Sequence, residues 1–207
     1  MTTSTEATTL ELVRTLPAST ERVFAAWTRP EKMRVWFAPG PMRVPVALCD
    51  LRVGGTYRIE MHAPDGNKYI AVGTYKEIVA NERLVFTWSW EGDPSPETLV
   101  TVTLRDLGGK TELKLAHDRF TSEEQRAQHL EGWTGCLDNL GASLGQVAVN
   151  CADLGCCEDV VSAPDAAKLM DALFDHAGAA HPDMAKAMTP EQAGQIKARI
   201  PEVTFTI

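Results

Sequence analysis

The chain has 207 residues, of which 44% are hydrophobic and 23% are charged, an ordinary globular composition with enough apolar material for a core. Its formal net charge of −8 argues against nucleic acid and against anionic membrane surfaces as partners. No apolar run approaches the roughly 20 residues of a membrane-spanning helix. The polar N-terminus does not read as a signal peptide, and five cysteines, an odd number, predict a reducing compartment, the cytoplasm, rather than a disulfide framework.

The residue pattern in the N-terminal part of the chain predicts a strand, two short helices and then a run of strands. After a polar stretch, residues 1–8, that we expect to be frayed, alternation predicts a strand over residues 9–16. The first short helix is capped by Ser19 or Thr20, and the second ends at Phe37. Alternating apolar residues, separated by turns rich in glycine and proline, predict six more strands. These strands cover residues 42–50, 56–61, 68–79, 83–90, 98–106 and 110–117.

One long amphipathic helix follows, over about residues 121–144. Thr121 is its candidate N-cap. Gly132 weakens a helix by roughly 1 kcal/mol relative to alanine, so we expect it to pack closely against another element. Apolar residues at three- and four-residue steps share one face, which should lie across the sheet. They are Leu130, Trp133, Leu137, Leu140 and Leu144.

Several short motifs accompany this order of elements. They are Ala26-Trp27-Thr28, Trp36-Phe37, Asp50-Leu51-Arg52-Val53-Gly54-Gly55, Pro64-Asp65-Gly66, Gly73-Thr74-Tyr75, Glu82-Arg83-Leu84 and Gly132-Trp133. With them, about residues 9–144 resemble the SRPBCC or START-like superfamily, and within it the Aha-type branch, named for homology to the activator of the heat-shock-chaperone ATPase. The resemblance implies an α+β helix-grip fold like that of the birch allergen. In this fold a bent, seven-stranded antiparallel sheet grips the long helix around a cavity.

The resemblance is more specific for fold than for function. The superfamily includes lipid carriers, plant hormone receptors, polyketide cyclases and antibiotic-sequestering proteins. Co-chaperone activity is not expected here, because the eukaryotic activator uses an additional chaperone-binding domain for it. The resemblance therefore implies a cavity without naming its occupant.

Our first functional hypothesis is the binding of a small apolar or aromatic ligand between the sheet and the long helix. Aromatic side chains suit a flat apolar ligand, and a histidine could add a polar contact. The candidate wall residues are Tyr57, Phe86, Trp88, His129, Trp133 and Leu137.

The second hypothesis is an enzyme of the cyclase or hydrolase type. His117 or His129 could act as general acid or base with Glu77, although such histidines are more often satisfied hydrogen-bonding residues. Glu60 and Glu77 could form a polar floor if their strands turn them inward. No serine or cysteine lies in a recognisable nucleophile motif, and Cys136 is expected to pack as a small hydrophobic residue.

Residues 146–207 continue beyond the resemblance as a helical C-terminal extension. Helices are predicted near residues 163–177 and 190–200, followed by a short strand-like tail. So short a segment with apolar helix faces should pack on the first domain, residues 1–145, or on the partner subunit of a homodimer. The third hypothesis is accordingly a stress-response or protein-interaction module.

Three cysteines precede these helices. Cys151, Cys156 and Cys157 could bind a soft metal, and His176 or His181 could add a ligand. Their spacing is not that of a zinc finger or ribbon, and adjacent cysteines do not readily point at one tetrahedral ion. From the sequence we therefore expect no metal and no other cofactor.

Overall fold

The structure is a computed structural model that describes residues 9–207, so the frayed start expected at residues 1–8 lies outside its described part. Contacts divide the chain into two compact units, Met1–Leu144 and Gly145–Ile207. Within the described residues, no helix is both long enough and apolar enough to cross a membrane.

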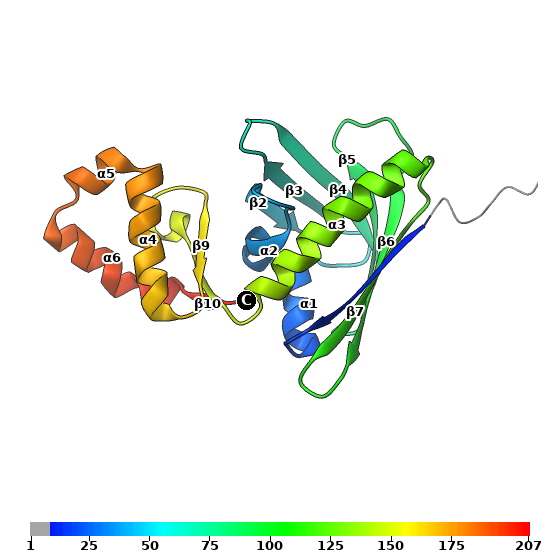
Figure 1. The fold of residues 1–207 in the computed structure, drawn as a ribbon, viewed down its shortest axis with the longest axis horizontal. Coiled ribbons are helices and arrows are strands. Elements are labelled where there is room, and N and C mark those ends of the chain that lie inside the picture. The colour runs from blue at the N-terminus through cyan, green and yellow to red at the C-terminus, as the bar shows by residue number, and fades with distance from the viewer. Residues whose placement is uncertain (1–8) are drawn as a thin grey trace, which may run out of the picture. The chain divides into compact units, whose positions relative to one another are not determined.

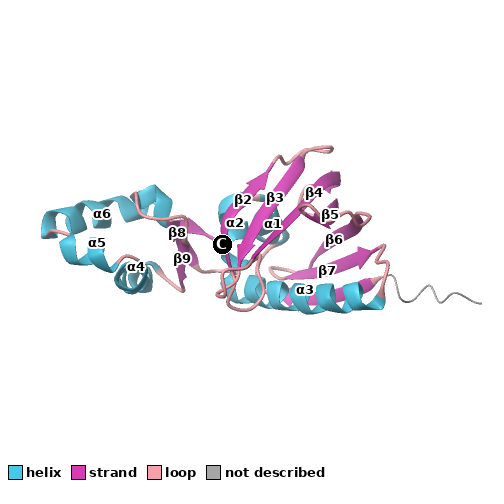
Figure 2. Cartoon of the chain, turned by 90° about the horizontal axis from the view of Figure 1, so that it is seen from above, coloured by secondary structure: helices cyan, strands magenta, loops and turns pink. Residues whose placement is uncertain are grey.

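The N-terminal unit has the predicted order of elements. These are β1 (Leu10–Leu16), α1 (Thr20–Thr28), α2 (Pro30–Trp36), β2 (Arg43–Cys49), β3 (Thr56–His62), β4 (Lys68–Val79), β5 (Arg83–Trp90), β6 (Thr98–Asp106), β7 (Thr111–Asp118) and α3 (Glu123–Ser143). The strands form one seven-stranded sheet in the order β1-β7-β6-β5-β4-β3-β2, with antiparallel neighbours throughout. The sheet curves around α3, which lies along one face of it (Figures 1 and 2). The helix-grip fold expected from the sequence is therefore confirmed.

Side chains at the predicted positions start the helices, with one shift. The Ser19 hydroxyl accepts a hydrogen bond from the backbone N–H of Arg22 and caps α1. For α3 the cap is Ser122, which accepts from the N–H of Gln125 at 3.2 Å, whereas Thr121 donates its hydroxyl to the Gln125 side chain. The predicted cap, Thr121, thus lies one residue too early.

Alternation along the strands builds the core, and the apolar stripe of α3 covers it. Trp133, Leu137 and Leu140 are all at most 3% exposed. The expectation for Gly132 is wrong, because a Cβ atom there would meet nothing within 4 Å. Gly135 makes the close approach instead, since a Cβ atom there would lie 2.9 Å from Cβ of Pro39.

The C-terminal unit contains the predicted helices and the strand-like tail, and also two strands that the sequence did not predict. Its elements are β8 (Val147–Asn150), the 3₁₀ helix η2 (Cys151–Leu154), β9 (Val160–Ala163), α4 (Ala166–Ala180), α5 (Pro182–Ala187), α6 (Pro190–Val203) and β10 (Phe205–Thr206). A three-stranded antiparallel sheet in the order β10-β8-β9 packs with the helices around a small core of its own.

Two helix ends in this unit also differ from the prediction. α4 continues through Gly178, and α6 continues through Pro201. Pro201 lies in the last turn of α6, where a missing backbone N–H removes only one hydrogen bond at the end of the helix. The predicted capping box is present: Thr189 and Gln192 each accept from the other's backbone N–H.

Candidate functional site

A hollow of about 110 Å³ lies between α3 and the sheet of the N-terminal unit. Buried aromatic and apolar side chains form its floor, whereas Trp90 is half-buried and Gln128 is exposed at its rim. The floor is closely packed, since the ring centroids of Trp88 and Trp133 lie 5.1 Å apart and those of Phe37 and Trp88 6.0 Å apart. The lining residues are Phe37, Pro39, Met61, Trp88, Trp90, Gln128, His129, Gly132, Trp133 and Cys136.

Beside this hollow, His117 is held in a chain of three hydrogen bonds. The indole Nε1–H of Trp133 donates to Nδ1 of His117 at 3.0 Å, and Nε2 of His117 lies 2.6 Å from Oγ1 of Thr98. The Thr98 hydroxyl donates in turn to the carbonyl oxygen of Trp88 at 3.0 Å. Because Nδ1 accepts, Nε2 carries the proton and donates to Thr98, so the imidazole is neutral.

The environment of His117 keeps it neutral across ordinary pH. Burial, with a smaller contribution from nearby His129, lowers the pKa of His117 to about 2. Both ring nitrogens are occupied, so the residue has no free site for proton transfer. His117 is therefore a satisfied structural histidine.

His129 is a polar group of the hollow with unused hydrogen-bonding capacity. Its Nδ1–H donates to the backbone carbonyl of Gln125 at 2.8 Å, which leaves Nε2 as a hydrogen-bond acceptor. Nε2 is buried and has no hydrogen-bond partner among the described residues. Burial lowers the pKa of His129, which favours the neutral ring. The indole N–H of Trp88, another lining residue, is likewise buried without a partner in the described part of the chain.

The six predicted wall residues divide into three groups. Trp88, His129 and Trp133 line the hollow. Tyr57 and Phe86 instead surround a separate space of only about 10 Å³, and the Tyr57 hydroxyl donates to the carbonyl of Thr87. Leu137 lines neither space and is a core residue, 1% exposed.

Sequence reasoning missed several of the lining residues. Phe37, Met61 and Trp90 lay on predicted apolar faces, but nothing in their spacing separates a lining position from a core position. Cys136 is buried, and burial raises the pKa of its thiol to about 12, so it packs as the small hydrophobic residue that we expected.

The two glutamates proposed for a polar floor lie elsewhere. Glu77 is exposed and pairs with Arg83 at 3.2 Å, because the register shift between Tyr75 and Glu77 breaks the alternation of β4 and turns Glu77 outward. The structure therefore gives His117 and His129 no partner in Glu77.

Glu60 belongs to an ionic cluster on the face of β3 opposite its buried residues. Its carboxylate contacts His62 at 2.6 Å and Arg58 at 3.1 Å, and these hydrogen bonds lower the pKa of Glu60 to about 2. Glu60 is thus an ionised partner of neighbouring side chains and not part of the hollow.

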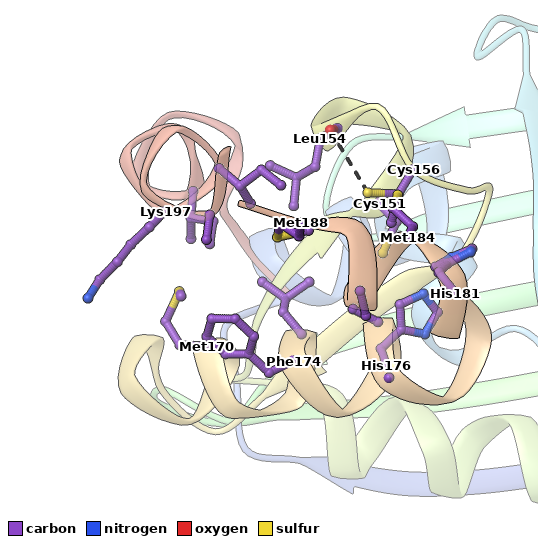
Figure 3. Close-up of a pocket in the computed structure, with 17 residues that line it drawn as sticks. Cys151, Leu154, Cys156, Met170, Phe174, His176, His181, Met184, Met188 and Lys197 are labelled. Carbon is purple, nitrogen blue, oxygen red and sulfur yellow. Dashed lines mark hydrogen bonds between the residues drawn. The ribbon is translucent and has the colours of Figure 1, made fainter. Parts of the chain in front are cut away.

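The C-terminal unit contains a second hollow, of about 150 Å³, between its helices. Met170 and Phe174 lie toward one end of it, and His176 and His181 lie at the other, near Cys151 (Figure 3). Cys151 is buried, Cys157 is half-buried and Cys156 is exposed. The ligand atoms of Cys151, Cys157 and His176 all lie within 4.8 Å of one another, whereas Cys156 is not a member of this group.

Two family models match the chain, one in each unit. The model of the family described as "Activator of Hsp90 ATPase homolog 1-like protein" matches residues 17–145, and that of a family described only as a protein of unknown function matches residues 147–202. The second match falls on the extension, for which the sequence suggested no relatives. No curated protein matches the chain.

Solved structures that are similar to this chain cover about two thirds of it. A crystal structure from Chromobacterium violaceum is 30% identical, with 65% of this chain and 95% of that chain covered and a TM-score of 0.59. One from Nitrosomonas europaea is 26% identical, covers 66% and 93%, and has a TM-score of 0.58. One from Silicibacter pomeroyi is 27% identical, covers 65% and 95%, and also has a TM-score of 0.58.

Proposed function

This chain belongs to the Activator of Hsp90 ATPase homolog 1-like family, and on that premise we propose that its N-terminal unit binds a small aromatic molecule carrying a hydrogen-bond donor. Domains of this fold family typically bind ligands. The observation that carries the proposal is an aromatic hollow with an unpartnered acceptor, Nε2 of His129, in its lining.

The size of the hollow limits the ligand. An apolar cavity of about 150 Å³ can hold benzene. A hollow of about 110 Å³ with an exposed rim suits one ring inserted against Trp88 and Trp133, with any larger substituent projecting past Trp90 and Gln128. Aromatic rings on the floor favour a flat ligand through offset or edge contacts.

The unpartnered nitrogen of His129 sets a second requirement, a hydrogen-bond donor on the ligand. A buried acceptor without a partner is costly, by about 1–3 kcal/mol, so a ligand that donates a hydrogen bond to His129 removes a penalty already present in the protein. A phenolic or similar hydroxyl meets this requirement, whereas a plain hydrocarbon does not.

Binding accounts for these features better than catalysis. A second ionisable group converging on the hollow beside His129 would favour general acid–base chemistry. His117 is neutral and fully hydrogen-bonded, and Glu77 is exposed in an ion pair with Arg83. We therefore place the cyclase or hydrolase hypothesis second, and the interaction module third because the hollow is not filled by side chains.

The test is titration of the full chain with 4-fluorophenol and with fluorobenzene, followed by ¹⁹F NMR. We expect one site for 4-fluorophenol, with fluorobenzene binding about 2- to 10-fold more weakly, the equivalent of one net hydrogen bond. The variant His129→Phe should bind both probes equally.

Gly132→Leu provides a variant that fills the hollow. A Cβ atom at Gly132 would meet no described residue within 4 Å, and Gly132 lines the hollow, so leucine there should extend into the hollow and weaken 4-fluorophenol binding at least about tenfold. The matched control is Glu131→Leu, which adds the same side chain at an exposed position of α3. Absence of binding to the wild type, or equal binding to Gly132→Leu, would contradict the proposal.

The cytoplasm remains our proposed location. The argument is the one made from the sequence: an odd number of cysteines, five, fits a compartment that keeps thiols reduced.

A further inference from the structure

The C-terminal unit brings together two thiols and two imidazoles that are dispersed in the sequence. Cys151 begins η2, Cys157 follows the loop after it, and His176 and His181 come from the last turns of α4 and its C-cap. Sγ of Cys157 lies 3.3 Å from Nε2 of His176, and Cys151 completes a group with all ligand atoms within 4.8 Å.

Local backbone structure turns the two cysteines toward each other. The N–H of Gly155 donates to the carbonyl of Ala152, and the N–H of Cys156 donates to the carbonyl of Cys151. Gly155 has φ of +79°, a left-handed conformation that glycine adopts without the steric cost of a Cβ atom. This tight turn reverses the chain, so that Cys157, and not the adjacent Cys156, faces Cys151.

His181 lies next to His176, outside the group of three whose ligand atoms are all within 4.8 Å of one another. Its ring centroid lies 5.3 Å from that of His176, and its Nε2 is buried without a hydrogen-bond partner among the described residues. His176 and His181 are separated by four residues, within the three to five that separate paired histidine ligands in zinc sites. An unpartnered buried nitrogen next to a group of potential ligands is itself evidence for a missing bonding partner.

We propose that Cys151, Cys157, His176 and His181 bind one zinc ion. Two ligand atoms of a tetrahedral zinc ion lie about 3.3 Å apart for two nitrogens, about 3.5 Å for a sulfur and a nitrogen and about 3.8 Å for two sulfurs, as follows from bond lengths of about 2.3 Å to sulfur and about 2.0 Å to nitrogen. The observed 3.3 Å between Cys157 and His176 needs only a small outward shift. Both thiol protons leave to solvent on binding, and two thiolates then neutralise the two charges of Zn²⁺, which suits a site that includes the buried Cys151.

A metal cross-link would stabilise this small unit. About sixty residues form a marginal domain, because a small chain buries too little apolar surface. The buried core consists of Val149, Cys151, Leu154, Val161, Ala163, Leu169 and Ile200. A metal bound to η2, the following loop and α4 would join the sheet side of this core to its helical side. The sequence spacing concealed this arrangement, because Cys151 and Cys157 are further apart than the paired cysteines of a zinc finger.

The test uses the full chain, reduced and stripped of metal, and titrated with Co²⁺ in place of Zn²⁺. We expect one equivalent to give the strong visible bands of tetrahedral Co²⁺ and a thiolate-to-cobalt charge-transfer band, both removed by one equivalent of Zn²⁺. Cys157→Ser and His176→Gln should each weaken Co²⁺ binding at least tenfold. Cys156→Ser is the matched control, because it removes a thiol from the same turn outside the group, and it should bind like the wild type.

A second measurement separates loss of a ligand from loss of the fold. In the wild type, hydrogen exchange of the backbone amides of α4 and α6 should slow at least tenfold on adding Zn²⁺ and return on adding a chelator. Amides of the N-terminal sheet should not respond. A reduced wild type that takes up no Co²⁺, or uptake that depends on Cys156 and not on Cys157, would overturn the site. Undiminished affinity in His181→Gln would overturn the fourth ligand.

Discussion

Replacing Trp133 with alanine tests how α3 is held on the sheet. Trp133 is 3% exposed, and its ring centroid lies 5.8, 5.5 and 5.1 Å from those of Trp27, Phe37 and Trp88. Truncating a buried tryptophan costs about 3–5 kcal/mol. The variant Trp133→Phe keeps most of the ring but leaves Nδ1 of His117 without its donor, so it should cost about 1–3 kcal/mol.

Urea unfolding followed by tryptophan fluorescence measures both losses. All five tryptophans lie between residues 27 and 133, so the signal reports the N-terminal unit alone. With a slope of about 2 kcal/mol/M, the midpoint for Trp133→Ala should fall by roughly 2 M. Glu131→Ala, on the exposed face of α3, is the control and should change stability by less than about 0.5 kcal/mol. A loss below about 1 kcal/mol for Trp133→Ala would refute the argument that this side chain joins helix and sheet.

Three further predictions concern single residues. Lowering the pH from 7 to 5 should reduce the stability of the N-terminal unit by about 2 kcal/mol through His117, because its pKa is about 2 in the folded state and about 6.5 in the unfolded chain, so that only the unfolded chain takes up the proton. Urea melts at both pH values should show a loss that is smaller by this amount in His117→Gln, and an equal loss in the variant and the wild type would contradict the prediction. Gly73→Ala should cost about 3 kcal/mol or more, since its Cβ atom would lie 1.9 Å from the carbonyl oxygen of Thr87, whereas Gly132→Ala should stabilise α3 by up to about 1 kcal/mol. Urea melts that rank the two variants in the opposite order would contradict the packing described for these two glycines. Glu77→Gln should leave the affinity for 4-fluorophenol within about twofold of wild type, because Glu77 is exposed and pairs with Arg83. A larger loss of affinity in the same NMR titration would show that Glu77 contributes to ligand binding.

The elements of the N-terminal unit, and the buried face of each, could be predicted from the amino-acid sequence. Residues 100, 102 and 104 of β6 and the stripe of α3 are read from period-two and period-3.6 patterns, which depend only on local backbone geometry. Turns, caps and the motifs shared with the family then gave the order of seven strands and a gripping helix. All of these signals lie within a few residues of one another along the chain.

The identity of the apolar residues that line the hollow follows from the packing of the elements and not from their sequence pattern. Trp88 and Phe86 occupy the same face of β5, and periodicity cannot tell that one reaches the hollow below α3 while the other is sealed next to Tyr57. Likewise, Gly132 and Gly135 are equal as helix breakers, and only the position of Pro39 makes one of them a close contact. These distinctions depend on where one element crosses another.

The same reason applies to the polar residues. A register shift in β4 turned Glu77 outward, and strands as short as β8 and β9 carry too few residues for their alternation to be recognised. The choice of Cys157 over Cys156 depended on the turn at Gly155 and on where α4 places His176. Such contacts cannot be predicted from local sequence patterns, because residues far apart in the chain come together only when the sheet and helices pack.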